Sequence, residues 1–429
     1  MNFRNTKTLH APLTGFLVTV CLSLAALAQN TPPASRPRPE PPKRGVCPLP
    51  ILPALPAYND TSFFAQTNAP RGKVEQLNYK NHAGQDKRLH VYLPPDYEKN
   101  VNARYPVLYL NHGGGDDDAK WSSLDPKNGG HAGAILDNLI AAGRARPMII
   151  VMPDTKGLAS ATPPAPGKDD ACTQEYLKDI IPLIDKSYRT RATRETRALA
   201  GLSMGGFVVM HTGLPHLDTF SELYVYSSGH IGDDTLKQFE DNFAATFKDP
   251  KFNDQFRVPF YMSQGETDIA LKNGQKVMAI LNKYGVRNFW VLSDGGHEWA
   301  NWRRNLFQTA QIMFPDCPAP ATASGATPPA PQTGAERWNA SIQTGVGTMD
   351  YVYEFHIQGN ALTGWAVGSM FGSAAISEGR VNGDEISFVE MMDGSIRVEY
   401  KGKRNGDEIR FDRKVGDLAT EEFVAKRAK

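Results

Sequence analysis

The stretch that decides the fold is Arg197-Ala198-Leu199-Ala200-Gly201-Leu202-Ser203-Met204-Gly205-Gly206-Phe207-Val208-Val209. A short apolar run enters a Gly-x-Ser-x-Gly motif, and a helix-like segment follows. A serine at a strand-to-helix turn is the context that a nucleophile elbow requires. The flanking glycines leave room for the sharp turn, which would lift the Ser203 hydroxyl above a sheet. We therefore expect Ser203 to be a nucleophile; the alternative is a tight glycine-rich turn.

Segments around this stretch alternate between strand-like and helix-like patterns. The later strand candidates are short, apolar and bounded by Gly, Pro or Asp, as buried parallel strands are. The expected strands are 74–80, 88–94, 106–111, 148–153, 196–201, 222–227, 258–263 and 288–293. The expected helices are 132–143, 172–188, 206–214, 234–247, 270–284 and 300–314. This alternation predicts a doubly wound α/β sheet with its site at the carboxyl ends of the strands.

A serine nucleophile needs a base, and the base needs a carboxylate to orient it. In α/β-hydrolases the chain order is serine, then acid, then histidine. Asp268 follows the expected strand 258–263, and His297 follows the expected strand 288–293. Both lie where strand ends converge, so we expect Ser203, Asp268 and His297 to form a catalytic triad.

Other residues could take these roles. His230 is the best rival for the base, although His297 alone follows a strand in the expected place. Glu266 or Asp294 could replace Asp268, which could instead cap the helix 270–284.

Acyl transfer also needs donors for the oxyanion that develops in the transition state. Asn111-His112-Gly113-Gly114-Gly115 follows the strand 106–111, where an HGGG-type loop belongs. We expect the backbone N–H of Met204 and that of Gly114 or Gly113 to form the oxyanion hole. The alternative is a flexible turn. The neighbouring Asp116–Asp118 could suggest a cation site, but we interpret it as a solvated acidic loop.

Several tryptophans lie near these loops in the sequence. We expect Trp121 and Trp299 to line the substrate pocket, and for Trp299 and Trp302 a role in packing is equally compatible with the pattern. Trp290 lies within an expected strand whose side chains alternate between its two faces, and this favours a place in the core.

Composition limits the function classes. The chain has 429 residues with 47 Lys+Arg and 46 Asp+Glu, so its formal charge is only +1. A general binder of nucleic acid or of an anionic membrane would show a basic excess. With a mean hydropathy of −0.41 and one long apolar run, the chain is no multi-span membrane protein.

Five segments are expected along the chain. Residues 1–28 combine Arg4 and Lys7, an apolar run and an Ala-x-Ala-like end, which predicts a signal peptide and a secreted or periplasmic protein. Ten prolines within 32–56 make 29–64 a Pro-rich segment whose later part is apolar enough to lie along the folded domain. We expect the catalytic domain over 65–316, a Pro/Ala/Thr linker over 317–334, and a small all-β domain over 335–429.

The expected tail domain contains an internal repeat. Asn382-Gly383-Asp384-Glu385-Ile386 recurs as Asn405-Gly406-Asp407-Glu408-Ile409, and 359–364 resembles a third copy. Asn-Gly between alternating apolar residues predicts tight hairpins and hence a meander, closed or sandwiched. Its aromatic residues would either stack on sugars, as in a carbohydrate-binding module, or form the core. They are Trp338, Tyr351, Tyr353, Trp365 and Phe371.

Signal cleavage would leave Cys47, Cys172 and Cys317. Three cysteines allow one disulfide and one free thiol, and the spacing does not choose the pair. No Cys-x-x-Cys pair supports a metal site.

The chain resembles the feruloyl and acetylxylan esterases of carbohydrate esterase family 1, in the wider esterase D group, over roughly 72–315. The motifs that carry this resemblance are 109–115 (YLNHGGG), 137–143 (DNLIAAG), 147–153 (PMIIVMP), 181–190 (IPLIDKSYRT), 200–206 (AGLSMGG) and 295–297 (GGH).

The resemblance implies a cofactor-independent serine esterase, with Ser203 as nucleophile, Asp268 as acid and His297 as base. It implies feruloyl or acetyl esters of plant xylan as substrates. Mycolyltransferases and enterochelin esterases share the core, so acyl transfer or another small ester is an alternative, as is a non-catalytic binding protein. The chain carries no xylanase module, and its tail matches no binding module of the family.

Overall fold

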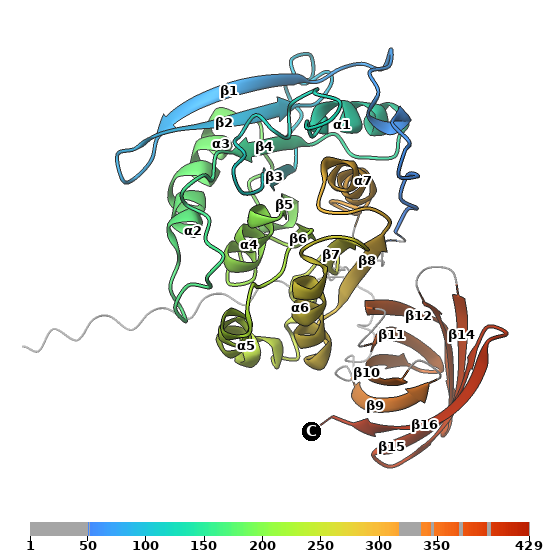
Figure 1. The fold of residues 1–429 in the computed structure, drawn as a ribbon. Coiled ribbons are helices and arrows are strands. Elements are labelled where there is room, and N and C mark those ends of the chain that lie inside the picture. Colours follow the sequence, from blue (N-terminus) through green and yellow to red (C-terminus); the bar gives the residue numbers. More distant parts are fainter. Residues whose placement is uncertain are drawn as a thin grey trace, which may run out of the picture. The chain divides into compact units, whose positions relative to one another are not determined.

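The computed structural model describes residues 50, 52–316, 336–344, 347–368, 372–392 and 396–428 (Figure 1). The expected signal peptide 1–28, the linker 317–334, Cys47, Cys317 and Phe371 lie outside the described residues. Cys172 is a buried free thiol. Among the described residues, no helix is both long enough and apolar enough to cross a membrane.

Eight strands form a sheet in the order β1-β2-β4-β3-β5-β6-β7-β8. The strands β3 to β8 are parallel, and β1 and β2 form an antiparallel hairpin at one edge, which joins the sheet through β4. The bounds are β1 Lys73–Lys80, β2 Asp86–Leu93, β3 Val107–Asn111, β4 Ile149–Pro153, β5 Arg197–Leu202, β6 Glu222–Tyr226, β7 Phe260–Gly265 and β8 Asn288–Ser293. The predicted doubly wound α/β sheet is confirmed.

Helices cover both faces of the sheet (Figure 1). The helices α1 (Ala132–Ala141) and α7 (Trp299–Ala310) belong to one apolar core, and the remaining helices belong to the core on the other face. These helices are α2 Ala171–Glu175, α3 Ile181–Ser187, α4 Met204–Val208, α5 Asp233–Phe247 and α6 Leu271–Lys283. The buried strands are apolar throughout because both faces are covered.

Three of the expected helices differ from the prediction. The expected helix 206–214 consists of the end of α4 and a π-helical turn, Val209–Gly213. The expected helix 172–188 contains a π-helical turn, Tyr176–Ile180. The α-helix resumes at Ile181 with Pro182 in its first turn, where the missing N–H of proline is tolerated. The expected helix 300–314 ends at Ala310 instead, and Phe314 has a positive φ of 56° that no helix contains.

The C-terminal strands form a closed antiparallel barrel. Each strand pairs with the next, and the last strand returns to pair with the first. The bounds are β9 Glu336–Thr344, β10 Gly347–Gln358, β11 Ala361–Gly368, β12 Gly372–Asn382, β13 Glu385–Met392, β14 Ile396–Asn405, β15 Glu408–Val415 and β16 Ala419–Arg427. The predicted all-β meander is therefore a barrel, the form of closure that removes free strand edges.

The repeated motifs form tight hairpin turns. The register pairs Asn382 with Glu385 and Asn405 with Glu408, so the two turn residues are Gly-Asp and not the expected Asn-Gly. Gly383 and Gly406 have φ values of 62° and 59°. A first turn residue with positive φ is what a type II′ turn requires of glycine, and the asparagine is left as the last residue of each strand.

Aromatic rings fill the barrel. Trp338, Tyr351 and Tyr353 belong to its core, and the Phe388 and Tyr400 rings stack with centroids 4.3 Å apart. An eight-stranded barrel is just wide enough for side chains to fill it. Of the two interpretations of the tail aromatics, core packing therefore describes these three rings.

The N-terminal segment lies along α7, as its apolar composition predicted. Gln308 Nε2 donates to the carbonyl oxygen of Pro53, and Arg304 Nε donates to that of Pro56. The Phe63 ring packs on Phe307 with centroids 5.1 Å apart. These contacts hold an extended, proline-rich segment on the surface of the helix.

Glu222, at the start of β6, is a fully buried carboxyl group. Its oxygens accept the Phe314 N–H at 3.0 and 3.1 Å and the Tyr224 hydroxyl at 2.9 Å. Burial raises the pKa of Glu222 to about 7, because these hydrogen bonds offset only part of the desolvation cost.

We expect Glu222→Gln to flatten the pH dependence of stability. Between pH 4.5 and 7 the folded protein keeps a proton that the unfolded chain has lost. The contribution of Glu222 is therefore complete below pH 4.5 and falls by roughly 3 kcal/mol as the pH rises to 7. Thermal melts should show a smaller loss of stability between pH 5 and pH 8 for the variant than for wild type. The exposed control Glu98→Gln should behave as wild type. An equal loss in Glu222→Gln would contradict this assignment.

Candidate active site

Ser203 stands at a strained turn between β5 and α4. Its backbone has φ 52° and ψ −116°, outside the regions that side chains favour. A Cβ on Gly201 would lie 2.3 Å from the Gly205 oxygen, and a Cβ on Gly205 would lie 2.6 Å from the His112 oxygen. Only glycine fits at both positions, which explains the Gly-x-Ser-x-Gly spacing.

A chain of hydrogen bonds links three segments that are far apart in the sequence. His297 Nε2 lies 3.0 Å from Ser203 Oγ, and His297 Nδ1 lies 2.9 Å from Asp268 Oδ1. Ser203 follows β5, Asp268 follows β7 and His297 follows β8. Parallel strands end at the same edge of the sheet, so these loops converge there. The geometry suits proton transfer from the serine hydroxyl to the imidazole.

The Asp268 side chain is fully buried. Burial by itself raises its pKa, but hydrogen bonds from His297 and the Ala270 N–H, together with the nearby Ser227 hydroxyl, outweigh this and hold the pKa below its usual value. The group is therefore a carboxylate at neutral pH, which suits a partner that orients an imidazole and stabilises its charged form.

The other candidates for the acid and the base lie elsewhere. Glu266 is exposed, and Asp294 pairs with Arg304 at 2.7 Å. His230 is buried and stacks on His211 with ring centroids 5.4 Å apart. Burial lowers the pKa of His230 to about 3, so this imidazole is neutral. Its ring also contacts Phe207 and Phe239, whereas the imidazole that contacts the Ser203 hydroxyl is that of His297.

The glycine loop after β3 packs against the elbow. A Cβ on Gly113 would lie 3.4 Å from Ser203 Cβ, and one on Gly114 would lie 3.0 Å from Met204 Cγ. His112 fixes the loop, since its Nε2 accepts the Thr155 N–H at 3.1 Å and its Nδ1 lies 2.8 Å from the Gly113 oxygen. Backbone N–H groups of this loop and of α4 are therefore close to the serine hydroxyl.

The interpretation of 116–118 as a solvated acidic loop is wrong for Asp118. Its side chain is fully buried and accepts a two-pronged hydrogen bond from Arg88, with N–O distances of 2.6 to 3.0 Å. Arg88 comes from β2, so a long-range partner stabilises this charge in the interior. A run of three aspartates gives no sign of such a partner.

The tryptophans next to the site are buried and serve mainly in packing. Trp121 is 1% exposed, donates its Nε1 proton to the Asn111 oxygen, and contacts Trp299 with centroids 5.1 Å apart. Trp299 is also buried, so Trp121 and Trp299 have little surface to offer a ligand. Trp302 is buried too and meets the His297 ring at 89°, with centroids 5.1 Å apart. It is the aromatic residue that limits how the imidazole can turn.

A brace from the N-terminal segment supports the His297 loop. The Tyr58 hydroxyl donates to Glu298 Oε1 at 2.7 Å, and the same oxygen accepts the Gly296 N–H at 2.9 Å. These contacts lie on both sides of His297. The sequence offered no signal for Tyr58, since it lies 240 residues from Glu298 in a segment with no recognisable motif.

A nucleophile elbow with histidine and carboxylate on the following strand ends, in a mostly parallel sheet, defines an α/β-hydrolase of the serine type. Residues 81–312 match the model of the Esterase family ("Putative esterase"), and the chain belongs to this family. The expected resemblance to carbohydrate esterase family 1 is also confirmed.

Curated proteins similar to this chain include a xylanase/feruloyl esterase and an esterase. An endo-1,4-beta-xylanase/feruloyl esterase from Xylanibacter ruminicola is 32% identical over 271 residues, covering 61% of this chain and 34% of that protein. The esterase Rv1288 from Mycobacterium tuberculosis is 32% identical over 157 residues, covering 36% of this chain and 31% of that protein. The chain thus matches only about a third of the length of these relatives.

A solved structure supports the fold. The feruloyl esterase module from Clostridium thermocellum, complexed with sinapinate, has a TM-score of 0.50 and 21% sequence identity. The match covers 63% of this chain and 96% of the module, so it concerns the hydrolase sheet and its helices.

We expect Ser203→Ala to lower kcat/KM for a soluble aryl ester by about 10⁴-fold or more, because the attacking hydroxyl is lost. The measurement is release of nitrophenol by the purified full chain. Ser341→Ala, an exposed serine of the barrel, is the matched control and should leave the rate unchanged. Near-normal turnover by Ser203→Ala would show that another group attacks the ester.

Tyr58→Phe should reduce kcat and leave KM nearly unchanged. It removes one hydrogen bond of the brace and keeps the ring, so a loss of about 2- to 10-fold follows from the usual worth of such a bond, roughly 0.5–1.5 kcal/mol. The control is Tyr284→Phe, whose hydroxyl donates to Glu240 at 2.8 Å on the far side of the domain. Equal rates for both variants and wild type would mean that the brace does not position His297.

Proposed function

We propose that this protein is a secreted serine carboxylic-ester hydrolase that removes feruloyl or acetyl groups from plant cell-wall xylan. The observation that carries this proposal is the hydrogen-bond chain from Ser203 through His297 to Asp268, on an elbow of the α/β-hydrolase type. Family membership adds to it, because the match covers the whole region from which these residues come.

In the proposed mechanism, Ser203 Oγ attacks the ester carbonyl while His297 Nε2 takes its proton. Asp268 holds the imidazole through Nδ1 and stabilises the imidazolium. Backbone N–H groups of Met204 and of Gly114 or Gly113 stabilise the oxyanion. His297 then protonates the leaving alkoxide, and a water activated by His297 releases the acid from the acyl-enzyme.

The relatives support the proposed substrate class. The Xylanibacter ruminicola protein is described as a xylanase and feruloyl esterase, and the matched region is of the size of one esterase domain. We therefore put feruloyl esters of xylan first and acetyl esters second. The near-zero net charge suits a largely neutral polymer, and the signal-peptide pattern over 1–28 supports an enzyme that acts outside the cytoplasm, where such polymers occur.

A substrate panel tests this proposal. We expect kcat/KM for methyl ferulate to exceed that for a short-chain nitrophenyl ester after correction for leaving-group reactivity, and ferulate to be released from feruloylated xylan. Ser203→Ala serves as the blank in each assay. If nitrophenyl esters are hydrolysed but neither ferulate nor acetate is released from xylan, the protein is an esterase and the proposed substrate is wrong. Transfer of the acyl group to an added sugar would identify an acyltransferase.

A further inference from the structure

A cavity of about 660 Å³ lies at the edge of the sheet opposite the serine. It is formed where three neighbouring strands begin, at Tyr105-Pro106 before β3, Arg146-Pro147 before β4 and Glu195-Thr196 before β5. These strands have five or six residues, so roughly 17–20 Å separate the cavity from the edge that carries Ser203. The cavity is therefore not part of the candidate active site, and its volume is within the range of small-molecule sites.

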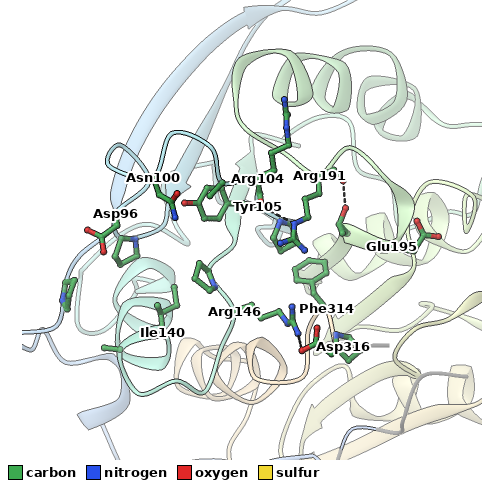
Figure 2. Close-up of a pocket in the computed structure, with 18 of the residues that line it drawn as sticks. Asp96, Asn100, Arg104, Tyr105, Ile140, Arg146, Arg191, Glu195, Phe314 and Asp316 are labelled. Carbon is green, nitrogen blue, oxygen red and sulfur yellow. Dashed lines mark hydrogen bonds and ion pairs between the residues drawn. The ribbon is translucent and has the colours of Figure 1, made fainter. Parts of the chain in front are cut away.

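Two arginines line this cavity from different segments of the chain. In Figure 2, Arg146 and Arg191 lie on the two sides of the Phe314 ring. Arg191 Nε donates to the Arg104 carbonyl oxygen at 3.0 Å, which fixes the side chain, and no ion pair is formed by Arg191 within the described part of the chain. Arg146 pairs with Asp316. Arg191 thus presents an uncompensated, oriented fork of donors, the group that matches a carboxylate or phosphate best.

The wall between these arginines is rigid. Phe314 is buried and has a φ of 56°, a conformation that costs energy for a residue with a side chain. It is held there by its N–H, which donates to both oxygens of Glu222 at 3.0 and 3.1 Å. The ring is therefore fixed in place before any ligand binds.

The charge and shape of the lining select the ligand. Four arginines line the cavity. Its three carboxylates each pair with a cation, Asp96 with Lys99, Glu195 with Arg194 and Asp316 with Arg146, so the lining keeps an excess of positive charge that suits an anion. The arginines are Arg104, Arg146, Arg191 and Arg257. The prolines of the lining supply flat apolar faces, and Pro70 and Pro147 are exposed. The rings of Tyr105 and Phe314 are buried in the wall behind them. Apolar faces beside an arginine fork suit a ring that carries a single carboxylate.

We propose that this cavity is a second binding site, which takes a ring-borne carboxylate, with Arg191 as the main anion-binding residue and the lining prolines as the apolar surface against which the ring packs. Two sources share this chemistry: a uronic acid sugar and a free hydroxycinnamate. The proposal does not depend on the esterase activity, because ligand binding here needs no turnover.

Calorimetric titration of the full-length Ser203→Ala protein tests the proposal. Sodium D-glucuronate and sodium ferulate are the probes, and methyl β-D-xylopyranoside is the neutral control. The same titrations are made with Arg191→Gln and Arg146→Gln added. Arg410→Gln, an exposed arginine on the barrel strand β15, is the matched control for loss of one positive charge.

We expect saturable binding of at least one carboxylate, no binding of the neutral xyloside, and about tenfold or greater weakening by Arg191→Gln, as the loss of a charge-assisted hydrogen bond implies. Arg146→Gln should also weaken binding, and Arg410→Gln should not. Binding of glucuronate alone identifies the sugar as the source, and binding of ferulate alone identifies the acyl product. Failure of both probes to bind, or ferulate binding that Arg191→Gln leaves unchanged, would overturn the proposal.

Discussion

The backbone conformation of Ser203 is the constraint on which the hydrolase domain depends. A non-glycine residue in such a region costs of the order of 1–3 kcal/mol, so the surroundings must impose it. Here the Ser203 N–H donates to the Tyr226 oxygen at 2.9 Å, and Gly201 and Gly205 approach each other more closely than any side chain would permit. The central place of β5 in the sheet makes this turn rigid. The loops after β3, β7 and β8 can then converge on a fixed hydroxyl.

The imidazole depends on a different kind of support. Its loop is short, and its position is set by Asp268 on one side, by the Trp302 ring on another, and by the Tyr58–Glu298 pair beneath the loop. A segment that looks like a spacer in composition therefore contributes to the precision of the site. Polar residues gather at both edges of the sheet because the ends of parallel strands bring loops together at each edge.

Much of the fold and the site follows from local sequence. The buried strands are short apolar runs with clear borders, and Ser203, Asp268 and His297 each stand just beyond such a run, so their convergence follows from the topology. What could not be predicted depends on contacts between distant segments. Asp118 is buried because Arg88 reaches it from β2, and Phe314 leaves the helical pattern because Glu222 holds its N–H. The Asn-Gly repeats predict the hairpins. Which two residues form each turn depends on the register of the paired strands, and the short motif does not determine that register.

The closure of the barrel has a kinetic consequence. Its strands pair with their neighbours along the chain, except at the seam, where Ala340 of β9 meets Ala425 of β16. That pairing has the greatest sequence separation of any in the domain, so it bears the largest loop-closure entropy. Until β16 has been synthesised, β9 and β15 each have an unpaired edge that could add to a strand of another chain. Pairing at the seam is thus the step at which a nascent barrel changes from an open sheet with two free edges into a closed domain.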